Sequence, residues 1–163
     1  MTVETLTLPR RVRPAEEAER IWIAGDTVHV VAGADDTGGA YTMLTVDVAP
    51  GGGPPLHLHD IEDEAFHVLD GVFAFEIDGE QVRAEAGAFL MVPRGTPHAW
   101  HNAGDAPARM LIVFTPGGID GFFREAGRPA EGDRPAPPVD ADEIARTAVA
   151  GARYGLRVMT WDR

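Results

Sequence analysis

The amino-acid sequence predicts an all-β fold, a single barrel or sandwich followed by short C-terminal helices. Short apolar or β-branched runs recur between turn residues from about residue 21 to residue 115, a spacing typical of sandwiches and barrels. Nineteen glycines and thirteen prolines provide many turns, which suits such a chain better than a helical bundle. Helix signals appear only after residue 118.

The β-rich region divides into strands at its turn residues. Asp70-Gly71 and Asp78-Gly79 are typical hairpin turns. Pro93 ends the apolar run before it, because proline cannot donate to a strand ladder. The expected strands are residues 21–25, 27–32, 40–48, 65–69, 72–77, 81–84, 88–92, 97–101 and 108–115, with a turn at 35–39.

Three segments are expected: an arm or edge strand (1–20), a barrel (21–117) and a helical extension with a possible final strand (118–163). In the extension, Asp140 and Glu143 form a capping-box pattern that opens a helix to about Tyr154, ended by Gly155. The other expected elements are a strand-like run at 5–8, a short helix at 119–126, a Pro-rich surface loop at 128–139 and a strand at 156–161.

Composition excludes several classes of protein. The net charge of −12 argues against a nucleic-acid surface, which needs a basic face. The chain has no cysteine and no lysine, so disulfides, thiolate metal sites and Schiff-base chemistry are excluded. No apolar run approaches the roughly 20 residues of a membrane span, and the charged N-terminus does not resemble a secretory signal. We therefore expect a cytoplasmic protein with no membrane or nucleic-acid partner.

Four residues in the middle of the chain have the side-chain types of a first-row metal site: His57, His59, Glu64 and His98. Side chains alternate faces along a strand, so His57 and His59 point the same way and can share one cation about 2.1 Å from each nitrogen. Glu64 can add an oxygen if the chain turns back into the sheet, and His98 must arrive from a neighbouring strand. The alternative is a polar barrel mouth without metal, which is costly to bury.

The two segments that contain these residues, 51–71 and 87–102, resemble the paired motifs of the cupin superfamily, G-x5-H-x-H-x4-E-x6-G and G-x5-P-x-G-x2-H-x3-N. The fixed positions of the first motif are Gly51, His57, His59, Glu64 and Gly71. Those of the second are Gly87, Pro93, Gly95, His98 and Asn102. The run PPLHLHDIEDEAFHVLDG is similar to small monocupins of the quercetin 2,3-dioxygenase type.

The resemblance implies a double-stranded β-helix, or jelly-roll, barrel holding one divalent transition metal on His57, His59, Glu64 and His98. It also implies that Glu64 is the catalytic base as well as a ligand, in a reaction where dioxygen cleaves a flavonol ring. The ligand set does not distinguish Fe, Mn, Ni, Co, Zn or Cu.

Strand parity selects the residues that could face the cavity or turn away from it. Trp100 and Asn102 share the parity of His98, and Phe66 shares that of Glu64. The expected substrate-pocket residues are Phe66, Phe73, Phe75, Met91, Trp100 and Asn102. The alternative for the aromatic residues is core packing. His29, His67 and His101 are not expected to be ligands, and Glu62 and Asp63 are expected to be solvated loop charges.

The function expected first is a metal-dependent oxygenase acting on a phenolic, flavonol-like or polyketide-like ring, with dioxygen as co-substrate. Aromatic and methionine residues favour an apolar or aromatic small molecule over a sugar phosphate. A non-oxidative cyclase or isomerase that uses the metal as a Lewis acid stays open, as does a binding cupin without turnover. A homodimer formed through residues 1–24 is also expected.

Overall fold

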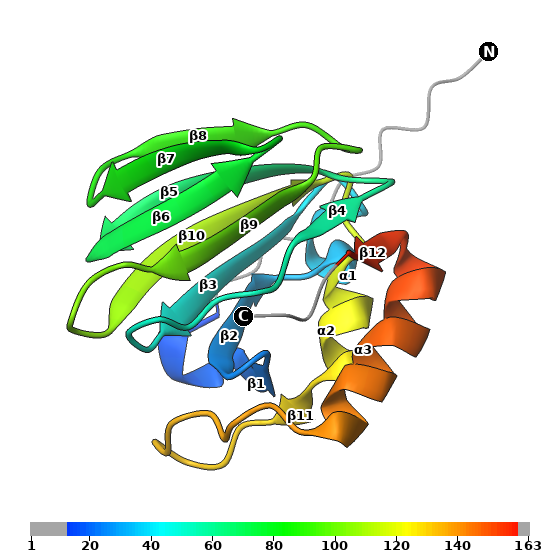
Figure 1. The fold of residues 1–163 in the computed structure, drawn as a ribbon. Helices are drawn as coiled ribbons and strands as arrows, with labels where there is room; N and C mark the ends of the chain where they lie inside the picture. The colour runs from blue at the N-terminus through cyan, green and yellow to red at the C-terminus, as the bar shows by residue number, and fades with distance from the viewer. Residues whose placement is uncertain (1–12, 160–163) are drawn as a thin grey trace.

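Two antiparallel sheets face each other in the computed structural model, which describes residues 13–159 (Figure 1). The larger sheet has the strand order β11-β1-β2-β3-β10-β5-β8, and the smaller has β12-β4-β9-β6-β7. The strands are β1 (Glu19–Ile23), β2 (Asp26–Ala32), β3 (Thr42–Val48), β4 (His57–His59), β5 (Asp63–Asp70), β6 (Val72–Ile77), β7 (Glu80–Glu85), β8 (Phe89–Val92), β9 (His98–Asn102), β10 (Ala108–Thr115), β11 (Arg128–Pro129) and β12 (Leu156–Val158). The helices are a 3-10 turn (Ala15–Glu17), α1 (Ala34–Thr37), α2 (Asp120–Ala126) and α3 (Ala141–Tyr154).

The all-β prediction is therefore confirmed, with short helices after the barrel strands. Where a turn was expected at 35–39, the structure has α1, a single helical turn that begins one residue earlier and ends at Thr37. The run at 5–8 lies outside the described residues, as do the last residues of the strand expected at 156–161.

Alternating side chains build the core between the sheets. Along β3 every second residue is buried, including Leu44, Val46 and Val48. On the paired strand β10, Met110, Ile112 and Phe114 are buried in the same way. Fully burying one such side chain contributes about 1.5–3 kcal/mol, so this period-two pattern fixes which face of each strand looks inward.

A glycine-rich loop brings the histidine strands together. The Gly51 N–H donates to the Asn102 carbonyl at 2.9 Å, and the Asn102 N–H donates to the Gly52 carbonyl at 3.0 Å. At Gly53, a Cβ would lie 2.1 Å from the Trp100 carbonyl oxygen, so a side chain cannot fit. This close approach delivers the chain into β4 beside β9.

The C-terminal segment covers one end of the sheets, where α2 and α3 lie side by side next to β12 (Figure 1). As predicted, α3 ends at Tyr154 and Asp140 caps it by accepting the Glu143 N–H at 2.8 Å; Gly155 follows with a φ of 70°. The second half of the expected capping box is absent among the described contacts, because the Glu143 carboxylate accepts the Ala24 N–H at 2.6 Å instead. Glu143 thereby ties α3 to the β1–β2 turn.

Among the described residues, no helix combines the length and the apolar character needed to cross a membrane.

Candidate metal centre

The four predicted ligands meet in the interior, between the two sheets. His57 and His59 lie on β4, and His98 lies on β9, directly paired with His57. Glu64 lies on β5 in the opposite sheet. All four side chains are buried, and one ligand atom from each lies within 4.8 Å of the others. The structure therefore brings together the whole set that the sequence predicts.

The Glu64 carboxylate is the centre of the cluster. Its Oε2 lies 2.9 Å from Nε2 of His98 and 3.4 Å from Nε2 of His59. The rings of His57 and His98 have their centroids 4.3 Å apart. Three imidazoles and one carboxylate are donors that first-row divalent metals accept, so this cluster is able to bind such a metal.

Two of the histidines are oriented by backbone carbonyls. Nδ1 of His57 lies 2.8 Å from the Pro55 carbonyl, and Nδ1 of His98 lies 3.0 Å from the Thr96 carbonyl. A carbonyl can only accept, so Nδ1 carries a proton and Nε2 is the ring nitrogen left available to a cation. Anchoring the far nitrogen in this way is typical of metal-binding histidines.

Electrostatics sets the charge of the cluster. Burial lowers the pKa of His57 to about 3, and the neighbouring His98 and His59 lower it further, so this imidazole is neutral. Burial alone would raise the pKa of Glu64, but the attraction of His59 and the hydrogen bond from His98 outweigh it and lower that pKa. For His98, burial lowers the pKa, yet the hydrogen bond to Glu64 prevails and raises it. Glu64 is thus a carboxylate at neutral pH, as both a ligand and a base must be.

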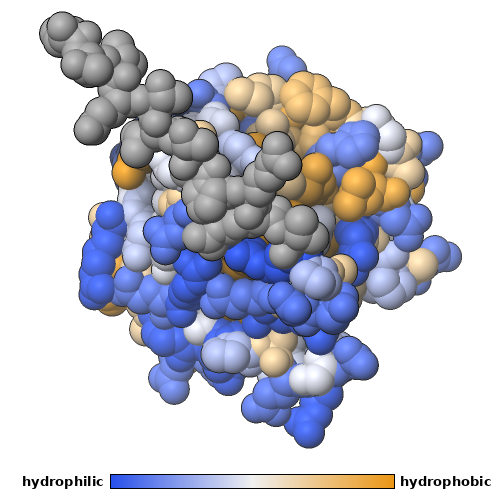
Figure 2. All heavy atoms as spheres, turned by 180° about the vertical axis from the view of Figure 1, so that it is seen from behind, coloured by the Kyte–Doolittle hydropathy of each residue, from blue (hydrophilic) through white to orange (hydrophobic). Residues whose placement is uncertain are grey.

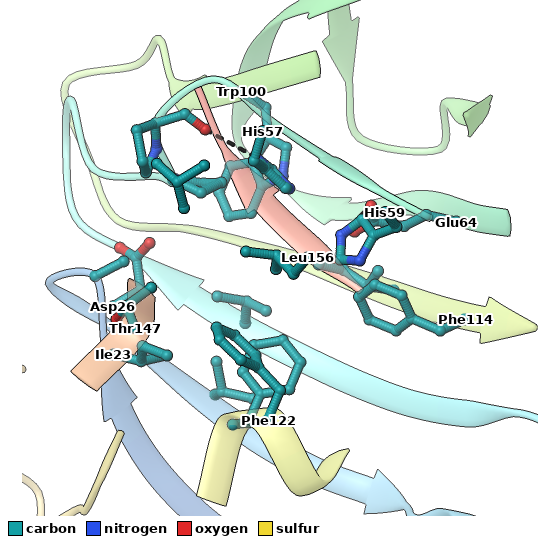
Figure 3. A pocket seen from close by; sticks show the side chains of 18 residues that line it. Ile23, Asp26, His57, His59, Glu64, Trp100, Phe114, Phe122, Thr147 and Leu156 are labelled. Carbon is teal, nitrogen blue, oxygen red and sulfur yellow. Dashed lines mark hydrogen bonds and ion pairs between the residues drawn. The ribbon is translucent and has the colours of Figure 1, made fainter. Parts of the chain in front are cut away.

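A cavity of about 90 Å³ adjoins the cluster, and His57, His59 and Glu64 form part of its wall (Figure 3). Most of the rest is apolar, and comes from both sheets and from the C-terminal segment. The apolar lining includes Ile23, Val28, Val46, Trp100, Ile112, Phe114, Phe122, Phe123, Leu156 and Val158. Asp26 and Thr147 add polar groups on the side of the cavity away from Glu64 (Figure 3).

The expected pocket residues separate into three groups. Trp100 lines the cavity. Phe66, Phe73 and Phe75 are fully buried in the core, with the Phe66 and Phe75 ring centroids 5.1 Å apart, and they lie outside the lining of this cavity. Their side chains point inward, as strand parity predicts, but they pack against other core residues and do not line the cavity.

Met91 and Asn102 also lie away from this cavity. Met91 is 49% exposed on the edge strand β8, which also carries the exposed Phe89. Figure 2 shows apolar side chains gathered on the upper right of that face of the molecule. The buried Asn102 amide donates to the carbonyls of Val48 and Ala106 at 3.0 and 2.8 Å, so it fastens the loop after β9. Both residues therefore have placements that differ from the expected lining.

The remaining histidines lie outside the cluster. His101 and His67 are exposed, as strand parity predicts, and His67 contacts the Ala88 carbonyl. His29 pairs with Asp47, its Nε2 lying 2.8 Å from Oδ2, a contact between adjacent strands that sequence inspection did not reveal.

The expectation for Glu62 is wrong. It is 4% exposed and faces His59 rather than solvent, whereas the adjacent Asp63 forms a surface ion pair with Arg94 at 3.0 Å. Residues of the cavity wall from α2, α3 and β12 were also not foreseen. No periodic signal marks them, because they reach the site through long-range packing.

Comparison with known proteins agrees with the motif residues and the fold. Residues 44–114 match the family model described as "Cupin domain". Bacillus subtilis quercetin 2,3-dioxygenase is 31% identical over 117 residues, which are 71% of this chain and 34% of that protein. The tetracenomycin polyketide synthase protein TcmJ of Streptomyces glaucescens is 30% identical over 110 residues, 68% of this chain and 65% of that protein. The chain belongs to the cupin superfamily.

Solved structures show the same fold. Pac13 of Streptomyces, described as a nucleoside dehydratase, matches with a TM-score of 0.58 and 20% identity over 69% of this chain and 88% of that one. A predicted oxalate decarboxylase of Thermotoga maritima matches with a TM-score of 0.57 and 24% identity over 65% of this chain and 99% of that one. The chemistries in these names differ, so the barrel alone does not specify a reaction.

Proposed function

We propose that the chain is a metal-dependent cupin oxygenase that acts on a phenolic, flavonol-like or polyketide-like ring. The observation that supports it is the cluster of three histidines and Glu64, which adjoins an apolar cavity and to which the described part of the chain adds no further ligand. An open position beside a metal is a feature of catalytic sites, whereas structural sites are closed.

The cluster residues have two proposed roles, binding a cation and transferring a proton. The three imidazoles, through Nε2, and the Glu64 carboxylate would hold one divalent transition metal. When bound, that metal supplies Lewis-acid polarisation and, if redox-active, electron transfer with dioxygen. Glu64 accepts the hydroxyl proton of the substrate, because its carboxylate forms part of the cavity wall.

The cavity wall selects the substrate class. Its aromatic and aliphatic side chains exclude water and pack on a planar ring, and none of the lining residues within 13–159 is a lysine or arginine that could bind a phosphate. A volume of about 90 Å³ is below the roughly 300–1,000 Å³ of typical ligand sites, so a single small ring fits this cavity. A three-ring flavonol is larger than this volume.

A second candidate is a non-oxidative cyclase or isomerase of polyketide metabolism. It is supported by the match to TcmJ, which covers more of the relative than the match to the dioxygenase does. The same carboxylate would then shuttle a proton between two carbons or oxygens of the substrate without any need for dioxygen.

Oxygen uptake separates the candidates. The protein is stripped of metal, loaded with Fe²⁺, Mn²⁺, Co²⁺, Ni²⁺ or Zn²⁺, and assayed against flavonols, monocyclic phenols and aromatic polyketides. The oxygenase predicts oxygen consumption that tracks substrate loss with a redox-active metal and none with Zn²⁺. Equal conversion without oxygen supports the second candidate. Saturable binding with no conversion under any metal indicates a binding cupin.

The homodimer and the cytoplasmic location stay predictions. Residues 1–12, which make up half of the segment expected to form the dimer contact, lie outside the described residues. Light scattering on the full chain and on a chain lacking residues 1–12 tests the dimer, which should be present in the first and weakened in the second.

A further inference from the structure

His59 differs from the other two histidines of the cluster in the surroundings of its Nδ1 atom. His57 and His98 each donate Nδ1–H to the carbonyl two residues earlier in the chain. Nδ1 of His59 is buried and has no hydrogen-bond partner among the described residues. The acidic oxygen that faces it is Oε2 of Glu62, at 3.6 Å.

The Glu62 oxygen is equally isolated. Oε2 is buried and also lacks a hydrogen-bond partner in the described part of the chain, although the side chain is only 4% exposed. The hydrogen bonds of Arg94 go to Asp63, and they are the main reason why the pKa of Arg94 is raised, with the charge of Glu62 adding to it. A buried carboxyl oxygen without a hydrogen-bond partner is costly, so the position of Glu62 needs a compensating role.

The loop that bears Glu62 is fixed at both ends. Before it, the Asp60 N–H donates to the Gly155 carbonyl at 2.7 Å and the Asp60 carboxylate pairs with Arg157 at 2.6 Å. After it, Asp63 accepts two hydrogen bonds from the Arg94 side chain and one from its backbone N–H. Glu62 is therefore directed inward by contacts on either side of it.

We propose that Glu62 is a positioning residue of the metal centre. Its carboxylate accepts Nδ1–H of His59, which fixes the tautomer, turns Nε2 toward Glu64 and makes the imidazole a stronger donor. The separation of 3.6 Å exceeds a hydrogen bond, and a small rotation of either side chain closes it. The proposal rests on the metal site of the proposed function.

Metal affinity tests this role without any assay of turnover. Co²⁺ is titrated in competition with a chelator into the wild type, Glu62→Gln and the matched control Glu80→Gln. The control makes the same change at an exposed residue of β7, which is not part of the cluster or of the loop that bears Glu62. Loss of a partner of this kind weakens metal binding by about 10–100-fold, and we expect that loss for Glu62→Gln only, with a changed Co²⁺ absorption spectrum.

The outcomes are distinguishable. If the wild type binds Co²⁺ and Glu62→Gln binds it equally tightly, or if Glu80→Gln weakens binding as much, the role of Glu62 is wrong while the metal site stands. A wild type that binds no Co²⁺ overturns both.

Nitrogen-15 NMR of the Zn²⁺-loaded wild type gives an answer even if Glu62→Gln does not fold. The His59 ring should carry a hydrogen-bonded proton on Nδ1 and the metal on Nε2. The opposite arrangement, or an Nδ1 proton in exchange with solvent, excludes the contact.

Discussion

Nε2 of His98 lies 2.9 Å from Oε2 of Glu64, and the two residues belong to opposite sheets. His98 is on β9 of the smaller sheet and Glu64 is on β5 of the larger one. A cation held by both would therefore connect the two layers as well as serve chemistry.

Metal should stabilise the fold for this reason. Because the four donors meet only in the folded chain, metal at 100 times its dissociation constant should raise the free energy of unfolding by about 2.7 kcal/mol. The measurement is thermal melting with Zn²⁺ and with a chelator. His98→Ala should abolish the metal-dependent shift, whereas the exposed His101→Ala should retain it. A shift that survives in His98→Ala contradicts its role as a ligand.

Glu64→Gln should separate metal binding from turnover. The amide oxygen can still face the cation, but it cannot take a proton, and loss of a general base typically costs 10²–10⁴-fold in rate. We expect kcat to fall by about that factor, with a detectable fraction of the metal retained, as measured by elemental analysis beside a steady-state assay. A variant with full activity would show that the base lies elsewhere.

Filling the cavity should block substrate and leave the metal in place. Val46→Phe adds a ring to a wall residue of the cavity of about 90 Å³, at a cost in stability of about 1–3 kcal/mol. The expected result is a loss of substrate binding with unchanged Co²⁺ affinity. Val31→Phe, the same change at a residue that is 39% exposed, is the control and should be silent. Substrate binding that persists in Val46→Phe would place the substrate outside this cavity.

Asp120 should make stability depend on acid pH. Burial alone would raise its pKa, but hydrogen bonds from Arg124, Thr42 and the Ala34 N–H prevail and lower it below the ordinary 3.8. A carboxyl whose pKa is lower in the folded chain than in the unfolded chain stabilises the fold at any pH above its unfolded-state pKa. This stabilisation is lost as the pH falls through its folded-state pKa.

Asp120→Asn should therefore destabilise the protein at neutral pH by about 1–3 kcal/mol, the usual cost of disrupting a buried hydrogen-bonded group. The deficit should shrink as pH falls below 3.8, where the wild-type carboxyl also becomes protonated. Urea unfolding at neutral and at acid pH measures it, with the exposed Asp35→Asn as control. A deficit that is independent of pH would assign the effect to packing instead.

The cluster of candidate ligands could be predicted because the pattern that marks it lies in short stretches of the sequence. The alternation of His57 and His59 is a property of one strand, and the spacing to Glu64 and His98 follows a known motif. The helix after Asp140 could be predicted for the same reason, since a few neighbouring residues signal where it starts and a few others where it ends.

The surroundings of the cluster could not be predicted because they depend on contacts between distant segments. Glu62 looks like a solvated loop acid until Asp60 pairs with Arg157 and the loop is drawn inward. Glu143 looks like a capping residue until Ala24 arrives as its donor. Parity places Phe73 and Phe75 on an inward face, but it does not say whether that face meets a cavity or other side chains.

The pairing of β12 with β4 has a consequence for how the protein is made. Leu156 lies opposite His59, Val158 lies opposite His57, and the Met159 N–H donates to the Leu56 carbonyl. During synthesis the strand with two of the ligands has an open edge until residues 156–159 have emerged, about a hundred positions after it. If the cluster holds a metal as proposed, we expect nascent chains to load it late and a protease cut ahead of Leu156 to weaken its binding.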